Sequence, residues 1–294
     1  MKKIFLLILL LSTLISCGKK EKIAEYGEIE EILKYGQLYK KGEDKAFTGK
    51  IIMRYYDGSI SHEISVKDGY KNGKYVQYYA KGQIYIKEFY KNGQLHGKSI
   101  TYYRNGKIKN KYIYKNGVSI KVGKDYYENG KIKMVVDYEK KTRKGYYENG
   151  KLYSEGRFYG EFFQDIIGEY KTYYPSGKIL GIKKYKGGEL DGEAITYYEN
   201  GNVKEKSYYK KGFKYGNYIS YYENGNIKEK AFYEGGMVRN GKRITCYENG
   251  NIETETFHDK QGLYHGEYRE YYKNGEIKVI EIYEHGKFIS KKEF

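Results

Sequence analysis

The chain has 294 residues, of which 41 are tyrosine, whereas tryptophan is absent and proline occurs once. Its formal net charge is +17, and 32% of its residues are charged. Charge alone would permit disorder, but 18% aromatic residues with regular turn signals argue against a disordered chain. Because tyrosine supplies much of the apolar area, the composition favours a thin structure with solvated hydroxyl groups over a compact dry core.

The first twenty residues predict export. Two lysines precede an apolar run from Ile4 to Leu11, and Leu-Ile-Ser follows directly before Cys17. A charged start and an apolar run are typical of a secretory signal, and the order of residues up to the cysteine resembles a bacterial lipobox. The resemblance implies a signal peptide over residues 1–16, with cleavage before a lipidated Cys17 that carries acyl chains such as palmitate. An uncleaved anchor and a plain secretory signal are the alternatives.

Residues 17–37 follow the predicted cleavage site and lack any repeat. They form either a tether to the lipid or a short helix that covers the first edge of the following sheet through Ile23, Ile29, Ile32 and Leu33. No later stretch approaches the roughly 20 apolar residues of a membrane-spanning helix. We therefore expect an exported, lipid-anchored protein. Gly18 is not acidic, and the lipoprotein resemblance then favours the outer membrane or the cell surface.

From residue 38 onward, pairs of aromatic residues recur before Asn-Gly turns, as in YYENGNVKEK at 197–206 and YYENGNIKEK at 221–230. Asn-Gly tolerates the positive φ of a tight reversal, so each block predicts a β-hairpin. The spacing is 23 to 25 residues, except for one interval of 20 followed by one of 27. This period predicts a repeat array instead of separate globular domains. The alignment places the first residues of the pairs at Tyr55, Tyr78, Tyr102, Tyr126, Tyr146, Tyr173, Tyr197, Tyr221, Cys246 and Tyr271.

The length of the hairpin loop decides which side chains share a face. A three-residue loop at 223–225 predicts one face with Ile219, Tyr221, Ile227, Ala231 and Tyr233, and an opposite face with Ser220, Tyr222, Lys228, Lys230 and Phe232. A two-residue Asn-Gly loop shifts the register by one position and mixes these sets. We prefer the three-residue loop, because it separates an aromatic and aliphatic face from a lysine-rich one.

A second glycine signal lies between the Asn-Gly turns, in YKNGQLHG at 90–97 and YKGGELDG at 185–192. This Tyr-x-x-Gly-x-x-x-Gly spacing resembles the MORN repeat, and the Tyr-Tyr-Glu-Asn-Gly block is similar to the bacterial second variant of that repeat. The resemblance covers about residues 38–290. It implies an all-β fold for residues 38–294, namely an elongated, single-layer antiparallel meander of about ten β-hairpin repeats.

The sequence contains no recognisable catalytic, metal-binding or cofactor-binding motif. We assign the glycines to turns, and four of the five histidines to loops between hairpins. Cys246 replaces the first tyrosine of a pair, so we expect it to be a small buried residue and not a nucleophile. The expectation is a protein that is not an enzyme and that holds neither a cofactor nor a metal.

The leading functional hypothesis is a scaffold that binds another envelope or secreted protein. Tyrosine rings bury a large amphipathic area at a small cost in side-chain entropy. The candidate partner-binding residues are Tyr173, Tyr197, Tyr198, Tyr221 and Tyr222, together with Phe158, Phe162 and Phe163 from the irregular repeat.

A lysine stripe supports a second hypothesis, in which the array binds anionic lipid or envelope polysaccharide through its positive field. Nucleic acid suits this charge but not an exported location. Lysines that only protect exposed sheet edges are a further alternative. The resemblance to the repeat family also implies an antitoxin or immunity protein as a third possibility. The stripe consists of Lys107, Lys109, Lys111, Lys204, Lys206, Lys228 and Lys230.

Overall fold

The computed structural model describes residues 21–32, 37–160 and 165–294. These residues form 27 β-strands and a single turn of 3-10 helix, η1 (Tyr26–Glu28). Twenty-five strands belong to one sheet, and two further strands pair separately. The predicted all-β meander is therefore confirmed. The predicted signal peptide and Cys17 lie outside the described residues.

From β4 onward, strands follow one another in space as they do in the chain, and successive hairpins pair antiparallel. The N-terminal strands are β1 (Ile23–Glu25), β2 (Ile29–Ile32) and β3 (Gln37–Lys40). The array strands are β4 (Gly49–Arg54), β5 (Ile60–Lys67), β6 (Tyr70–Tyr78), β7 (Ile84–Lys91), β8 (Gln94–Leu95), β9 (Gly97–Tyr102), β10 (Ile108–Lys115), β11 (Val118–Tyr126), β12 (Ile132–Asp137), β13 (Thr142–Tyr146), β14 (Leu152–Tyr159), β15 (Asp165–Tyr173), β16 (Ile179–Lys186), β17 (Glu189–Tyr197), β18 (Val203–Lys210), β19 (Phe213–Lys214), β20 (Gly216–Tyr221), β21 (Ile227–Glu234), β22 (Met237–Val238), β23 (Gly241–Cys246), β24 (Ile252–His258), β25 (Gly266–Tyr271), β26 (Ile277–Glu284) and β27 (Lys287–Glu293).

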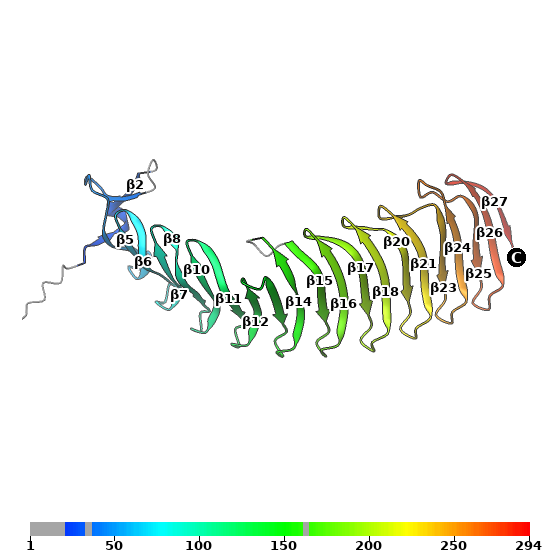
Figure 1. The fold of residues 1–294 in the computed structure, drawn as a ribbon, viewed down its shortest axis with the longest axis horizontal. Helices are drawn as coiled ribbons and strands as arrows, with labels where there is room; N and C mark the ends of the chain where they lie inside the picture. The colour runs from blue at the N-terminus through cyan, green and yellow to red at the C-terminus, as the bar shows by residue number, and fades with distance from the viewer. Residues whose placement is uncertain (1–20, 33–36, 161–164) are drawn as a thin grey trace, which may run out of the picture.

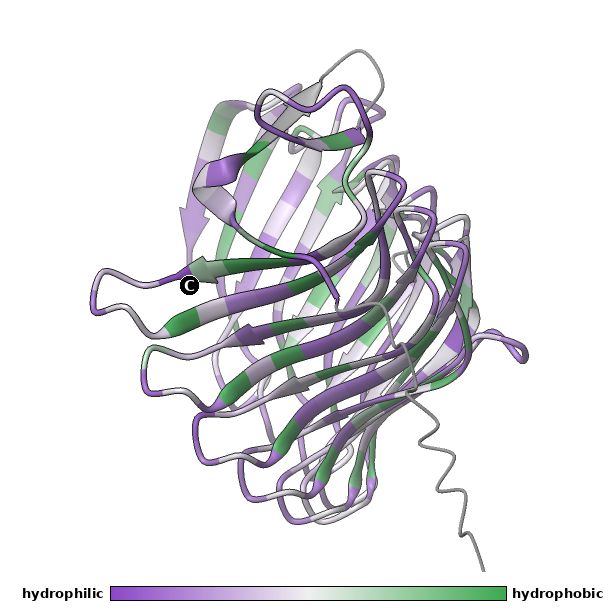
Figure 2. Ribbon diagram, turned by 90° about the vertical axis from the view of Figure 1, so that its left-hand side faces the viewer, coloured by the Kyte–Doolittle hydropathy of each residue, from purple (hydrophilic) through white to green (hydrophobic). Residues whose placement is uncertain are grey.

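The sheet is long and open. Its strands stand side by side along one axis, with the N-terminal segment at one end and β27 at the other (Figure 1). Seen from the N-terminal end, the strands are strongly curved, and hydrophobic and hydrophilic residues alternate along them (Figure 2). This alternation is expected where successive side chains of a strand point to opposite faces. Each hairpin is thus stabilised by its neighbours, as in other repeat arrays.

Every repeat reverses through a three-residue loop, which confirms the preferred loop length. In one example the Tyr222 amide donates to the Asn226 carbonyl (2.8 Å), and the Gly225 amide donates to the Tyr222 carbonyl (3.0 Å). The φ of Gly225 is 92°, a left-handed value that glycine adopts without a Cβ clash. The Asn224 side chain accepts from the Asn226 amide (2.9 Å), which holds the loop closed.

The predicted division into faces is wrong, because a β-bulge follows each loop. Tyr221 pairs with Ile227, but Ser220 pairs with Glu229, so one extra residue lies in the returning strand. This insertion moves the rest of that strand to the opposite side. As a result Ile219 lies beside Lys230, and lysines and isoleucines share one face.

Two names for the faces follow from this register. The capped face carries Tyr218, Ser220, Glu229, Ala231 and Tyr233 and the equivalent residues of other repeats. The open face carries Asn217, Ile219, Tyr221, Lys230 and Phe232 and their equivalents.

The predicted alignment of the first repeat also needs correction. The amide of Tyr55 donates to the carbonyl of Ser59, which makes Tyr55 equivalent to Tyr79 and not to Tyr78. Arg54 therefore takes the first place of the aromatic pair, and the first interval is 24 residues instead of 23.

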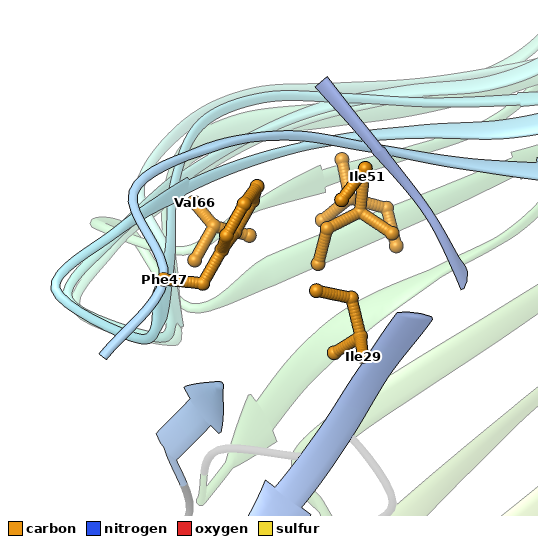
Figure 3. Close-up of a cluster of buried hydrophobic side chains, with 6 residues drawn as sticks. Ile29, Phe47, Ile51 and Val66 are labelled. Atoms are coloured by element: carbon orange, nitrogen blue, oxygen red, sulfur yellow. The ribbon is translucent and has the colours of Figure 1, made fainter. Parts of the chain in front are cut away.

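The N-terminal segment covers the first hairpins. β1 adds to the sheet as a parallel partner of β4, and Ile29 packs into a buried cluster with Phe47, Ile51 and Val66 (Figure 3). Because Ile51, Ile64 and Val66 lie on the capped face, the segment packs on that face. Residues 21–32 contain strands and η1, and no α-helix.

A second buried cluster occupies the irregular middle of the array. Val136, Tyr138 and Phe158 form it, with Tyr112 and Met134 packed against it. The rings of Tyr138 and Phe158 meet edge to face, with centroids 6.2 Å apart. This cluster coincides with the shortened repeat, in which β12 and β13 have 6 and 5 residues, whereas β10 and β11 have 8 and 9.

Several glycines lie within strands, so the assignment of all glycines to turns is wrong, and three of them lie against a tyrosine ring. A Cβ on Gly123 would lie 2.3 Å from the Tyr112 ring, and one on Gly156 would lie 2.5 Å from the Tyr170 ring. The third, Gly145, lies against Tyr153 in the same way. These glycines are needed because a tyrosine of the adjacent strand lies flat across the backbone.

Candidate functional site

Tyrosine hydroxyls join each repeat to the next. The second tyrosine of a pair donates its hydroxyl to the main-chain carbonyl of the residue that begins the following pair, as from Tyr198 to Tyr221 (2.8 Å) and from Tyr222 to Cys246 (2.7 Å). Nine such bonds run along the array, and we call them the tyrosine ladder. Its donors are Tyr55, Tyr79, Tyr103, Tyr127, Tyr147, Tyr174, Tyr198, Tyr222 and Tyr247.

Lysines from the bulge positions pack on the rings of the ladder. The ammonium group of Lys228 lies 5.6 Å from the Tyr222 ring centroid, and that of Lys204 lies 5.4 Å from Tyr198. Such a cation over a ring face is attracted by the ring quadrupole. The lysine at each of these two bulges therefore contacts a ladder tyrosine and helps to hold its ring in position.

The predicted partner-binding residues do not form one surface. Tyr198 and Tyr222 belong to the tyrosine ladder, whereas Tyr173, Tyr197 and Tyr221 lie half-buried on the open face. Phe158 is only 1% exposed, so its ring packs inside the second cluster and offers no contact area. Phe162 and Phe163 lie outside the described residues.

Tyr173 has a structural partner of its own. Its hydroxyl donates to Glu155 at 2.6 Å. Burial, with this hydrogen bond, raises the pKa of Tyr173 to about 12, and the hydrogen bond from Tyr173 lowers the pKa of Glu155. Tyr78 pairs with Glu63 in the same way (2.8 Å), and burial followed by that bond raises its pKa to about 12.

The predicted lysine stripe divides into three sets. Lys109, Lys204 and Lys228 cover ladder rings, and Lys107 donates to the Asn129 carbonyl (3.3 Å) at the turns. The remaining members, Lys111, Lys206 and Lys230, lie on the open face, each directly paired with an isoleucine of the neighbouring strand. Their aliphatic stems can cover those isoleucines while the ammonium groups reach water.

The N-terminal half of the open face is strongly positive. Within the described residues, five lysines gather there on neighbouring strands, and none of them takes part in an ion pair. Direct cross-strand pairing joins Lys111 to Lys124, which leaves like charges side by side. The five are Lys74, Lys87, Lys98, Lys111 and Lys124.

An exposed apolar patch lies on the open face in the C-terminal repeats. It consists of two rows, each with one side chain per repeat: Tyr208, Phe232 and Phe257 in the first row, and Phe213, Met237 and Leu263 in the second. Each of the six is between 39% and 62% exposed. Direct pairing of Phe213 with Lys210, and of Met237 with Glu234, places both rows on the same face.

Adjacent members of the second row lie close enough to form a continuous surface. A Cβ on Gly236 would lie 3.5 Å from Phe213, and one on Gly262 would lie 4.0 Å from Met237, so each apolar side chain rests near the next loop. The prediction from sequence missed this patch because it placed Phe232 on the lysine-rich face, apart from Ile219 and Tyr221. An aromatic residue at the same position in three consecutive repeats was the available signal.

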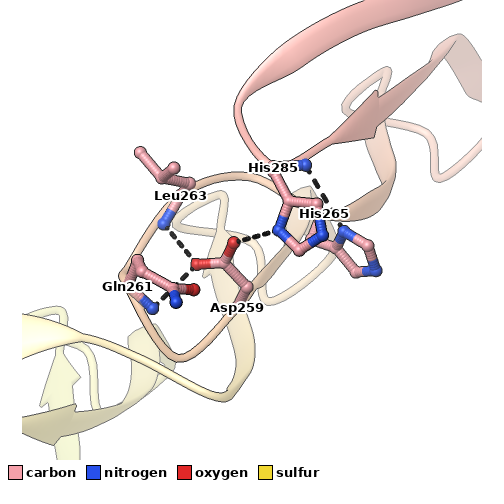
Figure 4. Close-up of polar contacts among 5 residues, drawn as sticks. All are labelled: Asp259, Gln261, Leu263, His265 and His285. Atoms are coloured by element: carbon pink, nitrogen blue, oxygen red, sulfur yellow. Dashed lines mark hydrogen bonds and ion pairs between the residues drawn. The ribbon is translucent and has the colours of Figure 1, made fainter.

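A polar contact ties the last two loops together at the edge opposite the Asn-Gly turns. Asp259 accepts from the amides of Gln261 and Leu263 (both 2.9 Å) and contacts His285 Nδ1 at 2.8 Å, while the rings of His265 and His285 lie 4.7 Å apart (Figure 4). The contact to His285 lowers the pKa of Asp259. Among the described residues, no group of three or more potential ligands could hold a metal ion.

Cys246 is buried, and burial raises the pKa of its thiol, as expected for a packing residue. Cys17 lies outside the described residues. No helix in the described part of the chain has the length and apolar character needed to cross a membrane.

Eight segments of the chain match a family model described as a MORN repeat variant, and together they cover more than half of the chain. They are residues 71–92, 95–116, 122–140, 141–159, 167–186, 190–211, 214–234 and 264–285. No protein among the curated ones matches the chain.

Solved structures show only weak likenesses. The chain matches TcdB2-TccC3-Cdc42 with 14% identity and a TM-score of 0.17, over 81% of this chain and 14% of that one. It matches the Photorhabdus luminescens Tc holotoxin pore with 11% identity and a TM-score of 0.18, over 82% and 16%. A porin-like protein from Bacteroides uniformis matches with 8% identity and a TM-score of 0.13, over 86% and 90%. The chain thus spans about a seventh of the length of the first two proteins. TM-scores this low do not indicate a shared fold.

Proposed function

This chain belongs to the MORN repeat variant family, and from that premise we propose that it is a non-catalytic scaffold that binds another protein on the open face of its C-terminal repeats. The exposed apolar patch carries the proposal. Six large side chains in two parallel rows are more than the scattered apolar residues of an ordinary soluble surface. Aromatic side chains and methionine are also enriched where proteins bind one another.

The tyrosines support this function indirectly. The hydroxyls of the tyrosine ladder bond one repeat to the next. These bonds fix the curvature of the sheet and so hold the exposed apolar patch in one shape. We further propose that Cys17 is lipidated and that the protein is held at the outer membrane or the cell surface. The partner is then an envelope or secreted protein, and a toxin neutralised by an immunity protein is one form of such a partner.

The first experiment compares partner capture by the wild-type chain and by a patch variant. The tagged protein is cross-linked in its own cells, captured, and washed in parallel at low and high salt. The patch variant carries Phe213→Ser, Phe232→Ser and Met237→Ser, and we expect it to lose a partner that the wild type retains at both salt concentrations. Apolar recognition resists salt, whereas contacts between exposed charges are screened.

The matched control carries Phe89→Ser and Val118→Ser, which remove exposed apolar residues from the N-terminal repeats. It should retain the partner. Loss of the partner from the control as well, or capture unchanged by the patch variant, would contradict the proposal.

The five-lysine group favours one second candidate, binding of an anionic lipid or envelope polysaccharide. Substitution of Lys98, Lys111 and Lys124 by glutamine should then abolish binding to anionic vesicles or polysaccharide at low salt, and wild-type binding should decrease steeply as salt is added. Binding that is insensitive both to salt and to these substitutions would exclude this candidate.

A further inference from the structure

A pocket of about 300 Å³ lies between the N-terminal segment and the first two hairpins. Ile29 and Leu38 line it from the N-terminal segment, and Ile51, Met53 and Ile64 line it from the capped face of β4 and β5. Its volume is at the lower end of the range for small-molecule sites, about 300 to 1,000 Å³. The pocket therefore has room for a small organic molecule and walls suited to an apolar one.

The polar groups of this pocket are basic or neutral. His62, Lys71 and two tyrosines, Tyr26 and Tyr75, complete the lining, which includes no carboxylate. Burial, followed by the charge of Lys71, lowers the pKa of His62, so the imidazole is neutral at pH 7 and Lys71 supplies the positive charge.

Lys71 is held by rings and not by a counter-ion. Its ammonium group lies 5.2 Å from the Tyr75 ring centroid and 5.3 Å from that of Tyr90. Among the described residues it forms no ion pair with a carboxylate. A half-buried cation beside an apolar cavity, which rests on two ring faces and has no ion-pair partner, gains most from an anionic ligand group.

We propose that this pocket binds a small amphiphilic anion, specifically a medium-chain carboxylate whose tail lies among the isoleucines and Met53 and whose head group contacts Lys71. The apolar lining supplies the free energy of binding through burial of the tail, and the single cation selects the head group. This inference does not rest on the proposed partner surface, which lies on the opposite face at the other end of the array.

The methionines allow a direct test. The full chain, kept in bilayer nanodiscs so that no detergent competes, is labelled with carbon-13 at the methionine methyl groups and titrated with octanoate. The Met53 methyl should shift saturably, whereas Met134 in the second cluster and Met237 in the exposed patch should not move. Octan-1-ol and acetate test the head group and the tail separately, and both should bind more weakly than octanoate.

Lys71→Gln should weaken octanoate binding about tenfold, which corresponds to loss of one charge-assisted contact, and should leave octan-1-ol binding unchanged. Lys74→Gln is the matched control, because Lys74 lies exposed on the open face of the same strand. Unshifted Met134 and Met237 signals in each variant verify the fold. Three results would overturn the proposal: no shift at Met53, equal shifts at Met237, or the same loss of affinity in both variants.

Discussion

The adjacent tyrosines of each pair lie on opposite faces and have different roles. The second, such as Tyr198, joins its repeat to the next through its hydroxyl. In three pairs the first tyrosine, namely Tyr78, Tyr173 or Tyr271, donates its hydroxyl to a glutamate of the preceding strand on the open face. A hydroxyl bound to a carbonyl contributes about 1 kcal/mol, so the ladder stabilises every interface between repeats by a similar amount.

Tyr198→Phe removes one bond of the ladder while it keeps the ring. We expect the free energy of unfolding to decrease by about 1 kcal/mol, because the Tyr221 carbonyl loses its donor. Denaturant titration followed by circular dichroism measures the change. Tyr208→Phe is the control, since Tyr208 is 47% exposed, and it should change stability by less than about 0.5 kcal/mol. If both substitutions decreased the free energy of unfolding equally, the hydrogen bond of the Tyr198 hydroxyl could not be the cause.

At the scale of the hairpin, sequence was sufficient for the turns and the period, because Asn-Gly has few alternatives to a tight reversal. Sequence was not sufficient to assign the side chains of a hairpin to the two faces of the sheet. The bulge at Lys228 leaves no signature in the composition of the strand, and its insertion exchanges the sides of every residue that follows. The exposed row at Phe232 was misread for the same reason, as it depended on the register.

Strand glycines are a second feature that the repeat pattern could not reveal. A glycine is needed where a tyrosine of the neighbouring strand lies across the backbone. Predicting that position requires the register of the two strands. Gly123 is the clearest case, since it lies under Tyr112, which is itself held by a 2.8 Å hydrogen bond to Asp125. The ring cannot move aside without loss of that bond.

Gly123→Ala should therefore decrease the free energy of unfolding by about 1 to 3 kcal/mol, the usual cost of overpacking. Gly241→Ala is the control, because a Cβ there lies no nearer than 3.6 Å to any atom and the backbone is not left-handed. The control should be nearly neutral. In addition, Tyr112→Ala combined with Gly123→Ala should be less destabilising than the sum of the two single variants. Additive effects would contradict the proposed contact.

At the scale of the whole molecule, tyrosine burial links stability to alkaline pH. The unfolded chain releases tyrosine protons near pH 10, whereas Tyr78 and Tyr173 keep theirs until about pH 12. The folded state therefore binds more protons between these values. Stability from these groups is complete below pH 10 and is lost as the pH rises through 12.

Absorbance at 295 nm should show this difference. In the folded protein, some tyrosines should titrate about two pH units above the tyrosines of the urea-unfolded chain, and the unfolding midpoint in urea should decrease between pH 10 and 12. A single class of tyrosines with a pKa near 10 in a still-folded chain would be incompatible with the half-buried hydrogen bonds from Tyr78 to Glu63 and from Tyr173 to Glu155.

The position of the two ends has a mechanical consequence. The N-terminal segment and β27 lie at opposite ends of the sheet (Figure 1). Tension between the proposed N-terminal anchor and the proposed partner on the last repeats would therefore act across the strands, along their hydrogen bonds. Bonds loaded in this direction break a few at a time, and hairpins peel off singly. Each 24-residue unit would release about 80 Å of chain at 3.3 Å per residue. Under load, the array would thus extend stepwise at low force and would act as an extensible tether.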